Sequence, residues 1–107
     1  MKFSIHLIAD ARQDILDICR YVVRNDSKEK AVRLLDNLEK SILRLASLPE
    51  RGHYPVELER VGVREYREIV FKPYRIIYQV VKSDVYVHCV LDGRRDLQDL
   101  LVERLLR

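Results

Sequence analysis

Residues 64–97, REYREIVFKPYRIIYQVVKSDVYVHCVLDGRRDL, decide the fold of this chain. Apolar and polar residues alternate in three runs, which is the period of strands with one buried face. The first strand is expected over about Arg64–Phe71 and ends at Lys72-Pro73, where proline interrupts pairing. The second is expected over Tyr74–Val81, and a tight turn at Ser83-Asp84 leads into the third. Such short connections predict an antiparallel meander.

The buried face of each later strand can be read from the same alternation. In the second strand it comprises Tyr74, Ile76, Tyr78 and Val80. In the third strand it comprises Val85, Val87, Cys89 and Leu91.

The residues before the meander predict one strand and two helices. Phe3, Ile5 and Leu7 alternate with polar residues, and an apolar helical stripe then runs to about Arg24. After a break at 25–27, Asp26 and Glu29 are spaced as a reciprocal cap for a second helix. The helical stripes comprise Ile8, Ala11, Ile15, Ile18, Cys19 and Val22 in the first helix, and Ala31, Leu35, Leu38, Ile42 and Leu45 in the second.

The rest of the chain completes an α+β domain. Glu50–Gly62 has no clean period and is expected to be a loop, and Asp96 can cap a C-terminal helix. The order β-α-α-β-β-β-α predicts an antiparallel sheet with a helical hairpin packed on one face, in a single domain over residues 1–107. The other face must be covered by the C-terminal helix or by a partner, or be free to bind something.

Composition sets broad limits on function. The net charge of +3 permits a nucleic acid or an acidic protein as partner and demands neither. No signal peptide or membrane span is expected, so we predict a cytoplasmic protein without membrane contact. Cys19 and Cys89 lie in apolar runs and are expected to be buried hydrophobic residues.

Metal and cofactor chemistry finds little support in the sequence. His6, His53 and His88 are isolated, and neither cysteine has a second ligand at a workable spacing. The three glycines are single, so no phosphate-binding loop is predicted. We therefore expect no metal and no cofactor.

Arginine and tyrosine are interleaved on the expected sheet. Arg67 and Arg75 can lie on neighbouring strands, with Arg94 and Arg95 at the end of a third, so their guanidinium groups could converge on a phosphodiester or a carboxylate. Tyr74 beside them could stack on a base. Two alternatives remain open: the arginines pair with nearby carboxylates, and the tyrosines pack in the core. The residues in these alternatives are Glu65, Glu68 and Asp96 for the ion pairs, and Tyr66, Tyr74 and Tyr78 for the packing.

Five short motifs, in this order, resemble those of the RelE/ParE toxin superfamily. They are Ala9–Ile15 with Tyr21, Leu48–His53, Tyr66–Glu68, Tyr74–Tyr78 and Gly93–Leu97. The resemblance covers essentially the whole chain and implies a small toxin of a type II toxin–antitoxin system, of the kind also called plasmid stabilisation proteins. It further implies neutralisation by a cognate antitoxin, expected to be small, acidic and encoded adjacently, which would add a helix or strand against an exposed sheet face.

The resemblance leaves two targets, ribosome-bound mRNA for RelE-like endoribonucleases and DNA gyrase for ParE-like inhibitors. In the nuclease branch Arg67, Arg75 and Arg95 would be catalytic, but a second basic position falls at Ile69 and the C-terminal tyrosine position falls at Leu100 or Leu101. The acid/base groups that RNA cleavage needs are therefore missing from their family positions, although Glu65, Glu68 or His88 could substitute.

The residues thus favour a ParE-like gyrase inhibitor over a RelE-like nuclease. One departure from the ParE-like pattern is Asp92, where many members carry histidine. For target or phosphate binding we expect a set comprising Arg67, Tyr74, Arg75, Arg94 and Arg95. A third possibility is a toxin fold that only binds its antitoxin.

Overall fold

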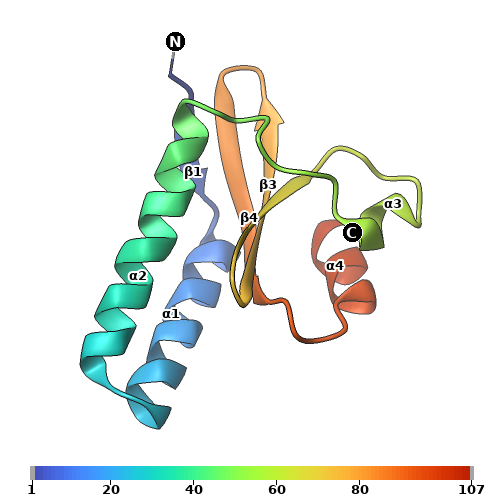
Figure 1. Cartoon of the computed structure of the whole chain (residues 1–107). Helices are drawn as coiled ribbons and strands as arrows, with labels where there is room; N and C mark the ends of the chain where they lie inside the picture. The colour runs from blue at the N-terminus through green and yellow to red at the C-terminus, as the bar shows by residue number, and fades with distance from the viewer. Residues whose placement is uncertain (1, 107) are drawn as a thin grey trace.

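The computed structural model of the chain describes residues 2–106 and shows the expected elements in the expected order, with two short helical elements added before the second strand (Figure 1). These are β1 (Ser4–Leu7), α1 (Ala9–Asn25), α2 (Lys28–Leu43), the 3-10 turn η1 (Arg44–Ala46), α3 (Val56–Glu59), β2 (Arg67–Phe71), β3 (Tyr74–Val81), β4 (Asp84–Asp92) and α4 (Gln98–Leu105). The α+β class is confirmed. The short helix α3 lies inside the segment expected to be a loop, and it positions a carboxylate described below.

The four strands form one mixed sheet in the order β1-β4-β3-β2. The meander is antiparallel as expected, but β1 pairs with β4 in parallel, from Ser4 opposite Asp84 to Leu7 opposite Val87. The expectation of an antiparallel sheet therefore fails for this pair, because alternation fixes which face is buried and not the direction of a strand. The turn between β3 and β4 uses Lys82 and Ser83, one residue earlier than expected, with Lys82 at a φ of 56°.

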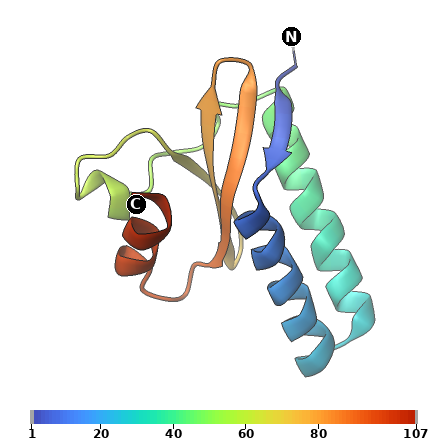
Figure 2. The same ribbon diagram turned by 180° about the vertical axis from the view of Figure 1, so that it is seen from behind.

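The α1–α2 hairpin covers one face of the sheet, as Figures 1 and 2 show from opposite sides. Ser27, not Asp26 with Glu29, caps α2, because its hydroxyl accepts a hydrogen bond from the Lys30 amide at 3.1 Å. The buried residues between hairpin and sheet are Ala11, Ile15, Leu38, Ile42, Leu45, Ile69, Ile76, Tyr78, Val85, Val87 and Val90.

The opposite face of the sheet is covered by α3 and α4. A second apolar core lies there, and it includes Cys89, whose thiol has its pKa raised to about 12 by burial. Its buried members are Leu58, Tyr66, Ile77, Cys89, Leu91, Leu97 and Leu101. The C-terminal helix therefore covers this face, which is one of the possibilities that the sequence left open, and the position of the antitoxin stays a prediction. Asp96 accepts a hydrogen bond from the Gln98 amide at 3.1 Å but precedes the cap position of α4, which is Leu97.

A bulge at His88 lets β4 contribute to both cores. Tyr78 pairs with Val87 and Ile77 pairs with Cys89, so His88 is passed over in the ladder. Before the bulge the odd-numbered residues of β4 face the helical hairpin, and after it the odd-numbered residues face the opposite side. Val85 and Val87 therefore face the hairpin while Cys89 and Leu91 face α4, which corrects the expectation that all four share a face.

His88 itself packs within the sheet, and its surroundings lower its pKa. Its ring meets the Tyr66 ring edge-on, with 5.3 Å between the ring centres, and its Nε2 lies 3.2 Å from Gln79 Oε1. Burial, reinforced by the nearby Arg104, lowers the pKa of His88 below its ordinary 6.5.

We expect this histidine to make the fold less stable in acid. The unfolded chain takes up the proton near pH 6.5 and the folded chain only at lower pH, so stability is fully present above 6.5 and falls as pH drops below it. His88→Gln should flatten the loss of unfolding free energy between pH 7.5 and 5, measured by urea denaturation. An unchanged pH dependence in the variant would contradict this assignment.

One carboxylate links three elements of the fold. Asp14 on α1 accepts the Val90 amide at 3.0 Å and pairs with Arg104 of α4, which also donates to the His88 carbonyl. This joins α1, the bulge of β4 and α4.

Within residues 2–106, no helix has the length and apolar character needed to cross a bilayer.

Candidate functional site

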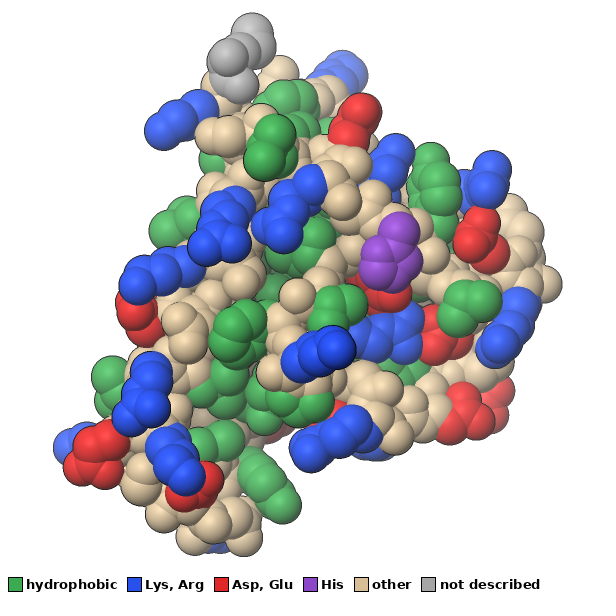
Figure 3. All heavy atoms as spheres, viewed as in Figure 1, with side chains coloured by type: hydrophobic (Ala, Val, Ile, Leu, Met, Phe, Trp, Pro, Cys, Tyr) green, Lys and Arg blue, Asp and Glu red, His purple; other side chains and the backbone are tan. Residues whose placement is uncertain are grey.

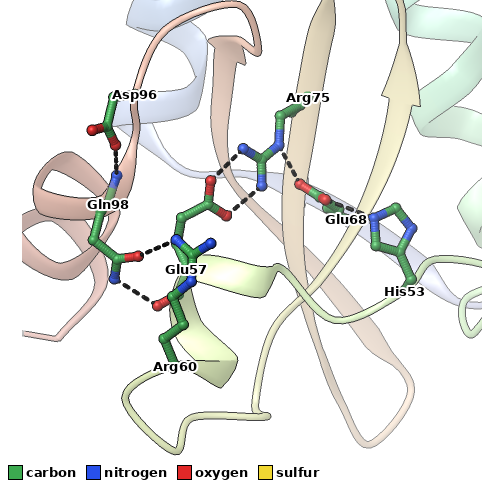
Figure 4. Close-up of polar contacts among 7 residues, drawn as sticks. All are labelled: His53, Glu57, Arg60, Glu68, Arg75, Asp96 and Gln98. Atoms are coloured by element: carbon green, nitrogen blue, oxygen red, sulfur yellow. Dashed lines mark hydrogen bonds and ion pairs between the residues drawn. The ribbon is translucent and has the colours of Figure 1, made fainter.

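Arg75 is the centre of a buried ion-pair network that joins β3, β2 and α3 (Figure 4). Its Nη1 and Nη2 donate to the two Glu57 carboxylate oxygens, both at 2.7 Å, and its Nε donates to Glu68 Oε1 at 2.6 Å. The three side chains are only 13%, 10% and 6% exposed, respectively. A guanidinium held this way has its bidentate edge already occupied by the protein's own carboxylate.

The electrostatics of the network stabilise its charged forms. Hydrogen bonds from Arg75 lower the pKa of Glu57, and hydrogen bonds to Glu57 raise the pKa of Arg75 despite its burial. Glu68 uses its second oxygen on His53, whose Nε2 lies 2.6 Å from Oε2. His53 also pairs with Glu68 through backbone hydrogen bonds in both directions, which extends the edge of the sheet by one residue.

Backbone and side-chain contacts fix α3, and with it Glu57. Gln98 Nε2 donates to the Glu57 carbonyl at 2.8 Å, and Arg60 donates to Gln98 Oε1 at 3.0 Å. Sequence periodicity missed Glu57 because a four-residue helix is too short to show a stripe. The available signal was Pro55, a residue that commonly precedes or opens a helix, with acidic residues following it.

Arg67 lies on the other face of the sheet from Arg75. It donates to the Gly52 carbonyl at 3.0 Å and to Tyr54 Oη at 3.3 Å, and its guanidinium lies 4.7 Å from the centre of the Tyr54 ring. Gly52 must be glycine there, since an added Cβ would meet the Glu68 carbonyl and Tyr78 Oη, each at 2.6 Å. Arg67 thus anchors the loop that precedes α3.

The convergence of arginines expected from the sequence is wrong for Arg67 and Arg75. In the β2–β3 ladder Arg67 pairs with Tyr78 and Arg75 pairs with Val70. Residues 67 and 70 are separated by an odd number, so the two arginines project to opposite faces. One phosphodiester cannot lie between them.

Arg94 and Tyr74 lie together where β4 ends and β3 begins. Tyr74 pairs with Asp92, and Arg94 donates to Asp92 through its backbone amide, Nε and Nη2 at 2.9, 3.0 and 2.6 Å. These hydrogen bonds lower the pKa of Asp92 to about 2. The Arg94 side chain remains 71% exposed, and Arg95 beside it is exposed too.

The other tyrosines and carboxylates singled out in the sequence hold structural or surface positions. Tyr78 is fully buried and its hydroxyl accepts a hydrogen bond from the Gly52 amide, while Tyr66 donates to the Leu105 carbonyl. These two contacts favour the packing role for those tyrosines. Glu68 is engaged by Arg75 and His53, and Glu65 is exposed beside Arg64 and Arg67 in a polar hollow. In the part of the chain described, residues 2–106, no group of three potential ligands is arranged to hold a metal ion.

An apolar groove opens between β1 and the helical hairpin. Its volume is about 400 Å³, and β1 beside it is an outermost strand of the sheet. Arg12 and Glu39 are its only charged lining residues among those described, and the apolar lining residues are Ile5, Leu7, Ile15, Leu35, Ile42 and Leu43. A groove of this size and character fits a protein segment better than a polar substrate.

Comparison with protein-family models identifies one family. The sequence model for the ParE toxin of the type II toxin–antitoxin system parDE matches residues 5–97. The solved chromosomal ParDE toxin–antitoxin system from P. aeruginosa has a chain of similar fold, with a TM-score of 0.71 and 15% identity over 85% of this chain and 96% of that one. Among curated proteins, no sequence matches closely enough to serve as an individual relative. This chain therefore belongs to the ParE toxin family of type II toxin–antitoxin systems.

Proposed function

We propose that this toxin inhibits DNA gyrase by protein–protein contact and that a cognate antitoxin neutralises it. The observation that carries the proposal is that carboxylates of the same chain bind the guanidinium of Arg75. In a ribonuclease this arginine would stabilise the scissile phosphate, yet three of its donors bind Glu57 and Glu68. Membership of the ParE family is consistent with gyrase as the target.

RNA cleavage by the alternative, RelE-like mechanism needs several groups that are free to act at one place. A base must take the proton of the 2′-hydroxyl, cations must stabilise the phosphate, and an acid must protonate the leaving oxygen. Arg67 and Arg75 are on opposite faces, and Glu68 is bound by Arg75 and His53. His88 is packed within the sheet with a lowered pKa.

The residues we propose for target contact are a part of the set expected from the sequence. Tyr74, Arg94 and Arg95 lie at one end of the sheet, and both arginines are exposed. Arg67 and Arg75 are assigned to the fold instead, since each is bound within the protein. On this proposal their substitution acts through stability.

The cognate antitoxin is proposed to fill the apolar groove beside β1. The groove would bury an apolar helix or strand of the antitoxin, and Arg12 at its margin would pair with an acidic residue of that segment. This places neutralisation on the hairpin side of the molecule.

A supercoiling assay tests the proposed function. We expect the purified protein to block supercoiling of relaxed plasmid by gyrase, the product of the adjacent gene to restore it, and ribosome-bound mRNA to stay intact. Cleaved mRNA with unaffected gyrase would support the RelE-like alternative. If neither target responds and the adjacent product still binds, the protein serves only as an antitoxin-binding module and the proposal fails.

A further inference from the structure

A preformed hollow lies beside the turn that joins β2 to β3. Its volume is about 400 Å³, Val70 and Pro73 are its apolar walls, and Glu68 and Arg75, which bind each other, also line it. Val70 is 48% exposed although it belongs to a strand, so it presents an apolar side chain to a partner. This hollow is separate from the antitoxin groove, which is lined by β1, α1 and α2.

The hollow has fixed walls. The Gly93 amide donates to the Pro73 carbonyl at 2.7 Å, which ties the β2–β3 turn to the end of β4. A Cβ at Gly93 would lie 2.8 Å from Arg75 Cδ and 3.0 Å from the Pro73 carbonyl oxygen, so the two segments touch without a side chain between them. A partner would therefore meet a surface that needs little ordering on binding.

Three cations line the hollow: Arg75 is bound by Glu57 and Glu68, and the other two are Lys72 and Arg94. Lys72 is exposed, and Arg94 is oriented by its three hydrogen bonds to Asp92 while its side chain stays largely in solvent. Figure 3 shows Lys and Arg side chains bordering hydrophobic ones on the face between the helical hairpin and the sheet.

We propose that this hollow receives an apolar side chain of the target protein and that a carboxylate next to that side chain pairs with Lys72 and Arg94. The inference rests on the proposed function and names the kind of segment on gyrase that the toxin recognises. Apolar walls with cations at the rim complement an acidic protein segment with an apolar anchor. A nucleic acid backbone is bound mainly through several free cations, whereas Arg75 in this hollow is already bound by Glu57 and Glu68.

Charge reversal at the rim tests the proposal. The double variant Lys72→Glu/Arg94→Glu should require at least tenfold more protein to inhibit gyrase supercoiling than the wild type. Lys72→Arg/Arg94→Lys should require less protein than the charge-reversed variant, because it keeps both charges. The matched control Lys28→Glu/Arg33→Glu, which reverses two exposed cations on α2, should stay within twofold.

Three results separate the possible failures, provided that all variants keep the wild-type Tm and antitoxin binding. Equal inhibition by the wild type and Lys72→Glu/Arg94→Glu would overturn this inference and leave gyrase as the target. Failure of the wild type to inhibit gyrase would overturn the proposed function and this inference with it. Binding of the wild type to duplex DNA alone, lost in the charge-reversed variant, would overturn the inference in favour of a nucleic acid site.

Discussion

Arg75→Met should destabilise the fold by about 3–5 kcal/mol, because it leaves Glu57 and Glu68 buried without their cation. Methionine keeps the aliphatic stem, so the loss reports the guanidinium and not a cavity. The measurement is the free energy of unfolding in urea at pH 7. The control Lys40→Met removes a cation from an exposed pair with Asp36 and should cost at most ~0.5 kcal/mol.

The pH dependence of the stability difference between Arg75→Met and the wild type supplies a second test of the buried ion pair. In the wild type the Arg75 hydrogen bonds lower the pKa of Glu57, so the stability it contributes is present above its ordinary pKa of 4.5 and is lost as pH falls below that value. In Arg75→Met the unpaired carboxylates are relieved by protonation. The gap between variant and wild type should therefore narrow as pH falls, and a constant gap would contradict the ion-pair account.

Asp14→Ala should cost about 3 kcal/mol, because Asp14 is the common partner of the Val90 amide and of Arg104. Its side chain is 15% exposed, so solvent cannot fully replace the lost contacts. Faster hydrogen exchange at the Val90 amide, together with the urea midpoint, measures the effect. Asp10→Ala is the matched control: its carboxylate is 3.9 Å from Arg104 and 69% exposed, and it should cost at most ~0.5 kcal/mol. Equal losses of unfolding free energy in the two variants would contradict this role of Asp14.

Sequence patterns predict most of this fold because its buried faces are periodic. The alternation over Tyr74–Val81 matches β3, and the apolar stripes predict both long helices to within a few residues. The bulge at His88 has no local signature, so the division of β4 between two cores could not be anticipated. The parallel pairing of β1 depends on how the hairpin packs, which periodicity does not encode.

The candidate site was harder to predict, for two distinct reasons. The opposite orientation of Arg67 and Arg75 follows from the two-residue turn at Lys72-Pro73, which pairs Phe71 with Tyr74 and thereby sets the register. The turn at Lys72-Pro73 could be read from the sequence, so this orientation was predictable. Glu57 as the partner of Arg75 was not foreseeable, because tertiary contacts with α4 position its short helix. Family resemblance predicts the fold and the toxin role but does not report how an arginine is used inside one member.

The most direct test of the central claim, that Arg75 is committed to carboxylates of its own chain, is a double-mutant cycle between Arg75→Met and Glu57→Gln. The measured quantity is the coupling free energy from urea unfolding of the four proteins at pH 7. We expect a stabilising coupling of about 2 kcal/mol or more for this buried, bidentate pair. A coupling near zero would mean that Glu57 does not hold the bidentate edge of Arg75, and would contradict the account.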